Sequence, residues 1–566
     1  MAARIASAAL ALLATTTRAQ YSGWMEDQAN ATMCTWKLPR VGIVRDTLYM
    51  DGGDLNWSAG MQTGEYSEPT LDRNPRGVML SLNLSKSFSF SDSDPDNITA
   101  LMDTHPRVSG ASNDIMALHV DGALLANDAR FFLYGGMTRK GGYVPDADYV
   151  QEYQAHALND DDSFEPGFVS GELPDGITRN VAYGVGVSAP SEGKAWYFSG
   201  ARAKDHGALY SWGTFGTEDG LASEMAESFV TLEFDRDSPN AETWRNDTLP
   251  DSVGKRGGAS GVFVPVGEEG ILVFMGGVTH GDFSSENITS ENPAALKEES
   301  EAFMTTIDIY DVASGNWYQQ KSSSSTHPPI LAMGCAVVQA APDRTSFNIY
   351  HYGGYGGADP REDFTDDVWI LTLPSFKWIK GLSGDDLHAR AGHRCVTPYP
   401  DQMMVVGGFV PAVGSGMDCL DGGVIQVLNL TSLEWLEGYD PEVYGEYGVP
   451  EVVFSEIGGD ARGGATATGP DGGWDDDNLG DVFAEAYPTD RITTWYPYGS
   501  AQSTERPEVD PDDDDGGGLP GWVAPTLGVV LGLIVVVVCG VAFVFWRRRK
   551  ALRQASMARR SNRDGK

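Results

Sequence analysis

Residues 271–277 read ILVFMGG, an apolar stretch of strand length that ends in two glycines. The same phrase returns along the chain at residues 47–53 (TLYMDGG), 130–136 (RFFLYGG), 348–354 (NIYHYGG) and 402–408 (QMMVVGG). A degenerate copy, residues 195–200 (AWYFSG), fills the wide gap between two of them. A phrase that recurs roughly every 50 residues is typical of propellers and solenoids.

Each copy predicts a buried strand, because the apolar run is rich in Val, Ile, Phe and Tyr. Glycine ends the strand because it allows turns and close backbone approaches that a side chain would block. A second phrase downstream alternates between apolar and polar residues and then reaches a tryptophan. The residues with these repeated structural roles are Gly52, Gly53, Gly135, Gly136, Gly276, Gly277, Gly353, Gly354, Gly407, Gly408, Trp317, Trp378 and Trp435.

The repeat predicts an all-β propeller. One such unit cannot bury both faces of its small sheet, whereas several units packed around an axis can, and ring closure limits exposed edges. Six blades fit the copies best. Seven stay open, because residues 452–459 (VVFSEIGG) are a further candidate. Residues 34–46 are expected to help close the ring with the last blade.

The pattern resembles the kelch repeat, in which a strand ending in Gly-Gly precedes a strand with an apolar stripe and a tryptophan strand. The resemblance covers roughly residues 36–440. It departs from that pattern at Ser199-Gly200, and in the first repeat, which ends at Phe88 or Phe90. A wider resemblance to fungal single-pass membrane-anchored kelch proteins rests on residues 46–53 and 458–474. It implies a repeat protein of unassigned activity.

The chain of 566 residues is strongly acidic, with a formal net charge of −40 and 41% hydrophobic residues. This composition provides for a large core and a solvated acidic surface. The charge argues against nucleic-acid partners and against binding to anionic membrane surfaces. It is compatible with cations or basic partners.

The two ends of the chain predict a type I membrane protein. Residues 1–19 have the charged start, apolar run and small cleavage residues of a signal peptide. Residues 522–546 contain no charged side chain and are followed by a basic tail, residues 547–566. The positive-inside rule then places the C-terminus in the cytoplasm and the N-terminus outside.

The remaining segments follow from this topology. Residues 20–498 are expected to form the extracellular propeller, and residues 499–521 an acidic, glycine-rich stalk. The lipid bilayer is then a partner through residues 522–546. The expected location is the plasma membrane or another membrane of the secretory pathway.

An outward-facing domain is expected to carry glycans and disulfides. The predicted glycosylation sites are the sequons at Asn30, Asn56, Asn83, Asn97, Asn246, Asn287 and Asn429. Four cysteines lie outside the predicted span, and sequence alone allows three pairings. The favoured single bridge joins Cys395 to Cys419, because the two residues flank one Gly-Gly strand.

The sequence predicts no catalytic residues, no metal ligands and no cofactor. It contains neither HExxH nor GxSxG, and no Cys/His spacing typical of zinc. An alternative remains open: a sugar oxidase of the galactose-oxidase type, which would hold copper with two His and two Tyr. Residues 350–352 (YHY) supply such side chains, but alternation along a strand puts His351 on the face opposite Tyr350 and Tyr352.

The favoured function is therefore a surface binding, adhesion or scaffold module that acts through the loops of the propeller rim. The expected partner is a protein or a carbohydrate at the cell surface. Residues 149–179 and 280–302 are the longest expected insertions within blades. Arg390 and His393 are expected to connect blades through hydrogen bonds.

Overall fold

The computed structural model describes residues 28–498 without residues 62, 64–66, 68, 73–77, 91–97, 99–100, 107–118, 140–142, 158–163, 212–219, 236–240, 282–291, 358–363, 385–386 and 412–417. For residues 28–30 and 71–72 it describes the backbone alone. By contacts the chain divides into two units, residues 1–500 and 501–566. The predicted signal peptide, stalk, span and tail lie outside the described residues.

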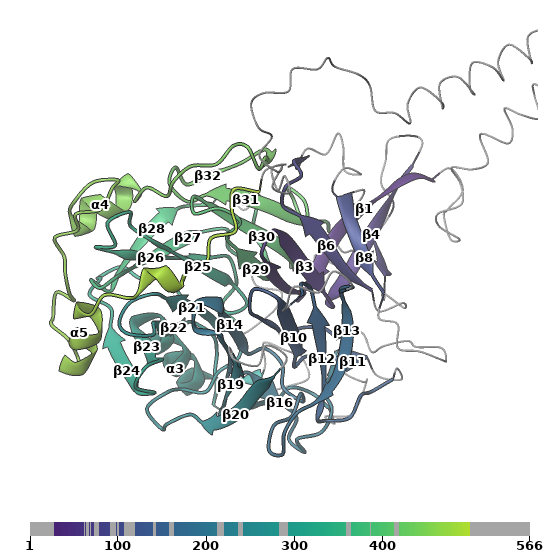
Figure 1. The fold of residues 1–566 in the computed structure, drawn as a ribbon, viewed down its shortest axis with the longest axis horizontal. Coiled ribbons are helices and arrows are strands. Elements are labelled where there is room, and N and C mark those ends of the chain that lie inside the picture. The colour runs from purple at the N-terminus through teal and green to yellow at the C-terminus, as the bar shows by residue number, and fades with distance from the viewer. Residues whose placement is uncertain are drawn as a thin grey trace, which may run out of the picture. The chain divides into compact units, whose positions relative to one another are not determined.

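The described strands form six four-stranded antiparallel blades, and the blades follow chain order around a ring (Figure 1). We letter the strands of each blade A to D from the axis outward. The first three blades are β2 (Arg40–Val44), β3 (Thr47–Asp51), β6 (Met79–Asn83) and β8 (Met102–His105); β9 (Ala123–Ala126), β10 (Arg130–Tyr134), β12 (Tyr149–Gln154) and β13 (Gly167–Glu172); and β14 (Val185–Ala189), β15 (Lys194–Phe198), β19 (Ser228–Phe234) and β20 (Glu242–Thr248).

The last three blades repeat this order. They are β21 (Ser260–Val264), β22 (Ile271–Met275), β23 (Thr306–Asp311) and β24 (Trp317–Lys321); β25 (Cys335–Ala340), β26 (Phe347–Tyr352), β27 (Val368–Leu373) and β28 (Lys377–Leu382); and β29 (Ala391–Val396), β30 (Gln402–Phe409), β31 (Ile425–Asn429) and β32 (Glu434–Trp435).

A glycine pair ends or follows the B strand in five blades, and Ser199-Gly200 follows it in the third. Gly276 and Gly277 follow β22 with φ angles of 64° and 87°. A Cβ on Gly276 would lie 2.7 Å from the carbonyl oxygen of Leu331, and one on Gly277 would lie 2.9 Å from that of Gly257. These glycines therefore serve both backbone conformation and close approach.

Six hydrogen bonds form a closed ring around the axis, at the start of the A strands. We call this set the axial ring: Leu38, Asp121, Tyr183, Gly258, Met333 and Gly392. Each member has a positive φ, between 54° and 68°. Five members donate their amide to the carbonyl oxygen of the preceding member, at 2.8 to 2.9 Å. The amide of Tyr183 donates instead to the Asp121 carboxylate.

The N-terminal strand connects the first blade to the last, as expected for residues 34–46. Strand β1 (Gln28–Lys37) pairs with β4 (Asp54–Met61), and Trp36 pairs with Gly408 of β30. The Cys34–Cys419 disulfide joins the same two regions across 385 residues of sequence. Every blade takes its four strands from one stretch of the chain, so β1, this disulfide and the axial ring join the first blade to the last.

Three sequence expectations are corrected. The candidate seventh blade, residues 452–459, contains helix α4 (Glu451–Ile457) rather than a blade strand. The first blade ends at β8, while β7 (Phe88–Ser89) pairs with β33 (Gly438–Tyr439). Residues 149–179 are not one insertion, because they contain both outer strands of the second blade, β12 and β13.

Among the described residues, no helix has the length and apolar character needed to cross a bilayer. The predicted span, residues 522–546, is not among them and stays a prediction.

Candidate functional site: two faces and an axial cavity

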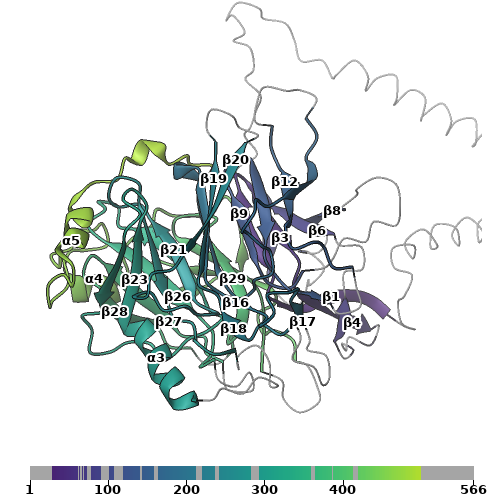
Figure 2. The same ribbon diagram turned by 90° about the horizontal axis from the view of Figure 1, so that it is seen from below.

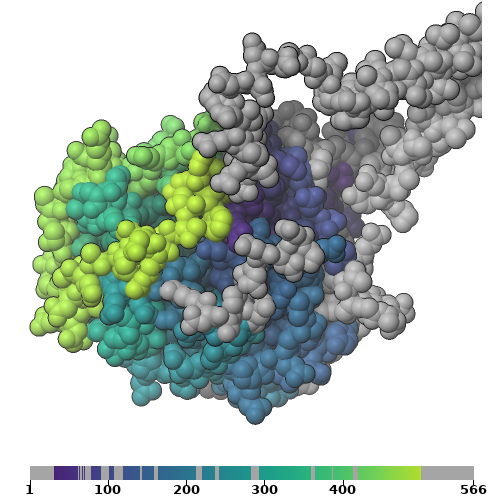
Figure 3. Space-filling model, in the orientation of Figure 1, coloured from purple at the N-terminus to yellow at the C-terminus, as the bar shows by residue number. Residues whose placement is uncertain are grey.

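One face of the propeller is covered by the chain that follows the last blade. We call residues 440–498 the C-terminal strap. It contains α4, α5 (Asp477–Ala484) and the short turn Thr489–Arg491. In Figure 3 its yellow-green residues cross the face turned toward the viewer.

The strap contacts the A–B turns of the fifth, fourth and third blades in that order. Gly464 donates its amide to Asp343 at 2.5 Å. Gly267 donates to the carbonyl oxygen of Glu485 at 3.1 Å. In the third blade Glu192, 6% exposed, accepts a 2.5 Å hydrogen bond from the Tyr487 hydroxyl.

The strap then reaches the other three blades. The indole of Trp495 donates to Asp128 of the second blade at 3.0 Å. The guanidinium of Arg45, in the first blade, lies 4.5 Å from the centre of the Trp495 ring. The amide of Tyr498 donates to the hydroxyl of Tyr399, in the sixth blade, at 3.1 Å. The strap thus contacts the A–B turn of every blade.

The opposite face carries the long connections between B and C strands. They include the described parts of residues 135–148, 199–227 and 276–305, the last of which contains helix α3 (Pro293–Thr305). Figure 2 shows α3 on the side of the ring away from the yellow end of the strap. We call this the B–C face. The second predicted insertion, residues 280–302, therefore belongs to it, although residues 282–291 are outside the described part.

Large exposed apolar side chains occur on both faces. Tyr143, 59% exposed, lies in a connection between B and C strands. Leu387, 56% exposed, lies between β28 and β29, in a connection from a D strand to the next A strand, which reaches the same face. Val443, Tyr444 and Tyr496 are exposed on the strap. Tyr444 stacks on Tyr399 with ring centres 4.2 Å apart. The strap-face aromatics therefore already pack on one another.

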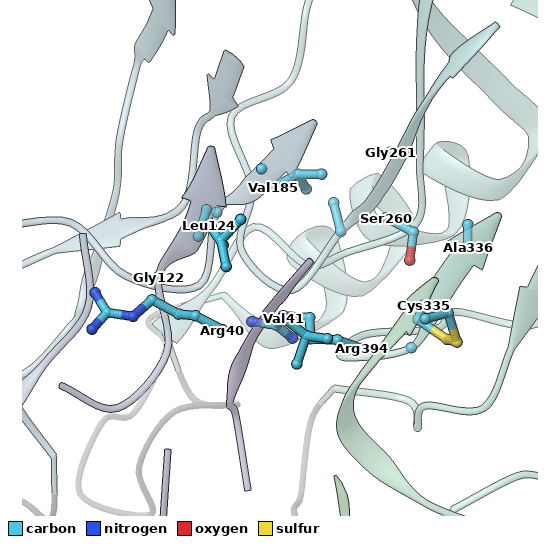
Figure 4. Close-up of a pocket in the computed structure, with 16 residues that line it drawn as sticks. Arg40, Val41, Gly122, Leu124, Val185, Ser260, Gly261, Cys335, Ala336 and Arg394 are labelled. Atoms are coloured by element: carbon cyan, nitrogen blue, oxygen red, sulfur yellow. A yellow bond between two sulfur atoms is a disulfide. The ribbon is translucent and has the colours of Figure 1, made fainter. Parts of the chain in front are cut away.

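A cavity of about 150 Å³ lies on the axis, between the axial ring and the strap face (Figure 4). Residues of all six A strands line it. They are small where the strands converge: a Cβ on Gly186 would lie 2.4 Å from the Cβ of Ala123, and one on Gly261 would lie 2.8 Å from Val185. Glycine is therefore needed at Gly186 and Gly261, where neighbouring A strands approach too closely for a side chain.

The charged groups of the cavity are paired. Arg394 donates to Asp121 of the axial ring at 2.5 Å. Arg40 forms an ion pair with Asp51, and burial lowers the pKa of Arg40 to about 10. A charge-paired cavity of this size offers little to an anionic ligand.

The Tyr350–His351–Tyr352 run alternates as predicted. Tyr350 and Tyr352 donate to the carbonyl oxygens of Leu430 and His388. His351 points to the fourth blade, where its Nε2 lies 3.2 Å from the Ser260 hydroxyl. Burial lowers the pKa of His351 to about 4. Both tyrosines are thus used in packing within the core.

The predicted connecting residues behave differently from each other. His393 joins two blades, since its Nε2 lies 3.2 Å from the Tyr352 carbonyl oxygen. Arg390 bonds mainly within the sixth blade, to the carbonyl oxygens of Gly407 and Gly423. Burial lowers the pKa of both side chains.

The cysteines pair differently from the expected bridge. Cys419 bonds to Cys34, and Cys395 bonds to Cys335, with Cα atoms 4.4 and 5.6 Å apart. The second bridge joins the A strands of the fifth and sixth blades. The expected Cys395–Cys419 pairing is therefore replaced by two bridges between distant parts of the chain.

The predicted glycan sites lie in different environments. Asn246 is exposed, whereas Asn83 and Asn429 are half-buried at strand ends. Asn56 is only 5% exposed and donates to the Thr35 hydroxyl at 2.9 Å, which does not fit a glycan on that residue. Asn97, Asn287 and the side chain of Asn30 lie outside the described part.

Comparison with known proteins agrees with the repeat. A "Kelch repeat-containing protein" of Arthroderma benhamiae is 27% identical over 583 aligned positions, which cover 94% of this chain and 78% of that protein. The chain is similar to a kelch-repeat protein, and it folds as a six-bladed β-propeller. No family model matches it. The solved structure of YjhT aligns with 72% of this chain and 98% of its own, at 12% identity and a TM-score of 0.41.

A kelch-repeat propeller indicates a protein-binding or scaffold module. Sequence reasoning found the repeat but missed the strap and the axial ring. The strap has no repeated phrase, and its contacts are with turns of little sequence signature. Only the glycines of the ring, Gly258 and Gly392, carry a local signal for positive φ.

Proposed function

We propose that this kelch-repeat propeller is a membrane-anchored surface module that binds a protein or carbohydrate partner through its B–C face. The observation that carries the proposal is the strap. Because residues 440–498 contact the A–B turn of every blade, the opposite face is the one left with long insertions on a rigid scaffold. Loops so placed are where binding residues concentrate.

The tether of the proposed module is the predicted stalk, residues 499–521, and the predicted span, residues 522–546. The described chain ends at Tyr498 on the strap face. The acidic surface favours a neutral or basic partner over an anionic one.

The oxidase alternative has less support. Its cofactor needs a cysteine cross-linked to a tyrosine, yet each of the four cysteines in the described part is in a disulfide. Tyr350 and Tyr352 are committed to core hydrogen bonds. We therefore keep the binding module as the proposed function.

The test presents the full chain on cells or in vesicles to panels of soluble polysaccharides and cell-surface proteins. Tyr143→Ala and Leu387→Ala change the B–C face, and Tyr444→Ala is the matched change on the strap face. Truncating a central contact residue of an interface typically costs more than about 1 kcal/mol. We expect weaker binding from the first two variants and unchanged binding from the third. The opposite order, or peroxide release on sugars, would contradict the proposal.

A further inference from the structure

Two cysteines and a histidine meet where the A strands of the fifth and sixth blades lie side by side. Cys335 begins β25, and His393 and Cys395 are two residues apart on β29, so they share one face of that strand. Both sulfurs and one ring nitrogen of His393 lie within 4.8 Å of one another. In the structure the two sulfurs form a disulfide.

The hydrogen bonding of His393 leaves one ring nitrogen as a ligand. Its Nε2 lies 3.2 Å from the carbonyl oxygen of Tyr352. A carbonyl only accepts hydrogen bonds, so Nε2 carries the proton and Nδ1 the lone pair. The side chain is fully buried, and Nδ1 has no hydrogen-bond partner among the described residues. An imidazole held by a backbone carbonyl in this way is typical of metal ligands.

We propose that, when the Cys335–Cys395 disulfide is reduced, Cys335, Cys395 and His393 together bind one soft ion of the Zn²⁺ class. The reductant is a dithiol, which supplies two electrons and two protons and becomes a disulfide itself. Binding then releases the two thiol protons, because the thiolate is the ligand. This inference does not depend on the proposed binding function.

The distances suit such a site. Zn–S bonds of about 2.3 Å and Zn–N bonds of about 2.0–2.1 Å place tetrahedral ligand atoms about 3.5–3.8 Å apart. The three atoms already lie within 4.8 Å of one another, and once the sulfur–sulfur bond is broken the two cysteine side chains must rotate to separate the sulfurs to this spacing. Sulfur and imidazole are also the ligands that zinc selects over harder cations.

The surroundings provide a fourth position. Both cysteines line the axial cavity, and Figure 4 shows Cys335 on the same side of it as Ser260. The cavity, about 150 Å³, has room for a water beside the ion. The charge of nearby Arg394 is offset by Asp121 at 2.5 Å. The site would therefore have three protein ligands and an open position, as in catalytic rather than structural zinc sites.

The second disulfide has no comparable third ligand beside it. Cys34 and Cys419 are joined in the same way, but the neighbour of Cys419 is a hydroxyl, Ser58 Oγ at 3.4 Å. No second group of three such ligands occurs in the part of the chain that the structure describes. Reduction alone should therefore not create a three-ligand site there.

The experiment uses the full chain in detergent with Cys34→Ser and Cys419→Ser, so that one disulfide remains outside the predicted span. The protein is reduced with a dithiol, desalted without oxygen and titrated with Co²⁺. We expect thiolate-to-cobalt charge-transfer absorption that saturates at one equivalent and is displaced by Zn²⁺. The oxidised protein should show none.

The variants separate binding from folding. Cys335→Ser should abolish the band, and His393→Gln should weaken Co²⁺ binding at least about tenfold. His327→Gln, at an exposed histidine, is the control. Circular dichroism of each variant shows whether it is folded. A reduced, folded protein without the band would overturn the proposal, as would a band that survives Cys335→Ser.

Discussion

The backbone amide of Leu38 donates to the carbonyl oxygen of Gly392 at 2.8 Å, and this one hydrogen bond joins the start of the first blade to that of the last. It is the closing member of the axial ring. Both residues have positive φ, 54° for Leu38 and 66° for Gly392. The ring therefore depends on backbone conformations that most side chains disfavour.

Gly392→Ala is expected to destabilise the propeller. The left-handed conformation costs a residue with a Cβ about 1–2 kcal/mol. The new Cβ would also lie 2.8 Å from the ring of Phe409. We expect the free energy of unfolding to fall by at least that cost, measured by urea denaturation. Gly167→Ala is the control, because that Cβ would meet nothing within 4 Å. Equal stability of the two variants would contradict this role of the ring.

The B-strand glycines could be predicted from sequence because they recur in a fixed phrase. The axial ring could not, because Leu38, Tyr183 and Met333 are not residues that favour positive φ. Their conformation is imposed by hydrogen bonds between blades, which link residues far apart in the chain. The disulfides could not be predicted for the same reason, since Cys34 and Cys419 are 385 residues apart in the sequence.

The candidate site, too, could be predicted from the sequence only in part. The sequence predicted that function would lie on rim loops, and alternation placed His351 correctly. It did not indicate which face is covered, because the strap contacts turns such as residues 190–193 through single side chains. Nor did it bring His393 and Cys395 close to Cys335, which lies on another blade.

The strap should be held by its buried contact with the third blade. The Tyr487 hydroxyl donates to Glu192 at 2.5 Å, and Arg491 lies 3.1 Å from the same carboxylate. A hydrogen bond to a charged group contributes about 1.5–3 kcal/mol. Tyr487→Phe should therefore lower stability by that order and speed proteolysis within residues 470–498. Tyr143→Phe, at an exposed tyrosine, should change neither, and an unchanged cleavage rate in Tyr487→Phe would count against a firmly bound strap.

Glycosylation should distinguish Asn246 from Asn56. Asn246 is exposed on β20, whereas the amide of Asn56 is buried against Thr35. In cells that glycosylate the chain, Asn246→Gln should lower its apparent mass by one glycan. Asn56→Gln should leave the mass unchanged and reduce stability through the lost hydrogen bond, by about 0.5–1.5 kcal/mol. A mass shift for Asn56→Gln would show that this side chain is accessible to the glycosylation machinery.

Acid should weaken the fold through His351. Burial lowers its pKa from 6.5 to about 4, so the unfolded chain binds a proton first as pH falls. The contribution of His351 to the free energy of unfolding is constant above about pH 6.5. It decreases between pH 6.5 and about pH 4, and it is constant again at lower pH. One pKa unit corresponds to about 1.4 kcal/mol, so the step is on the order of 3 kcal/mol.

His351→Gln should remove this step while leaving an amide that can reach Ser260. Urea denaturation at pH 7.5, 5.5 and 4.5 measures it as the difference in pH dependence between the variant and the unaltered chain. His327→Gln, at an exposed histidine, should retain the full pH dependence. We attribute the step to the buried, neutral state of His351. If the free energy of unfolding depended on pH in the same way for His351→Gln and for the unaltered chain, the imidazole would be free to protonate in the folded protein.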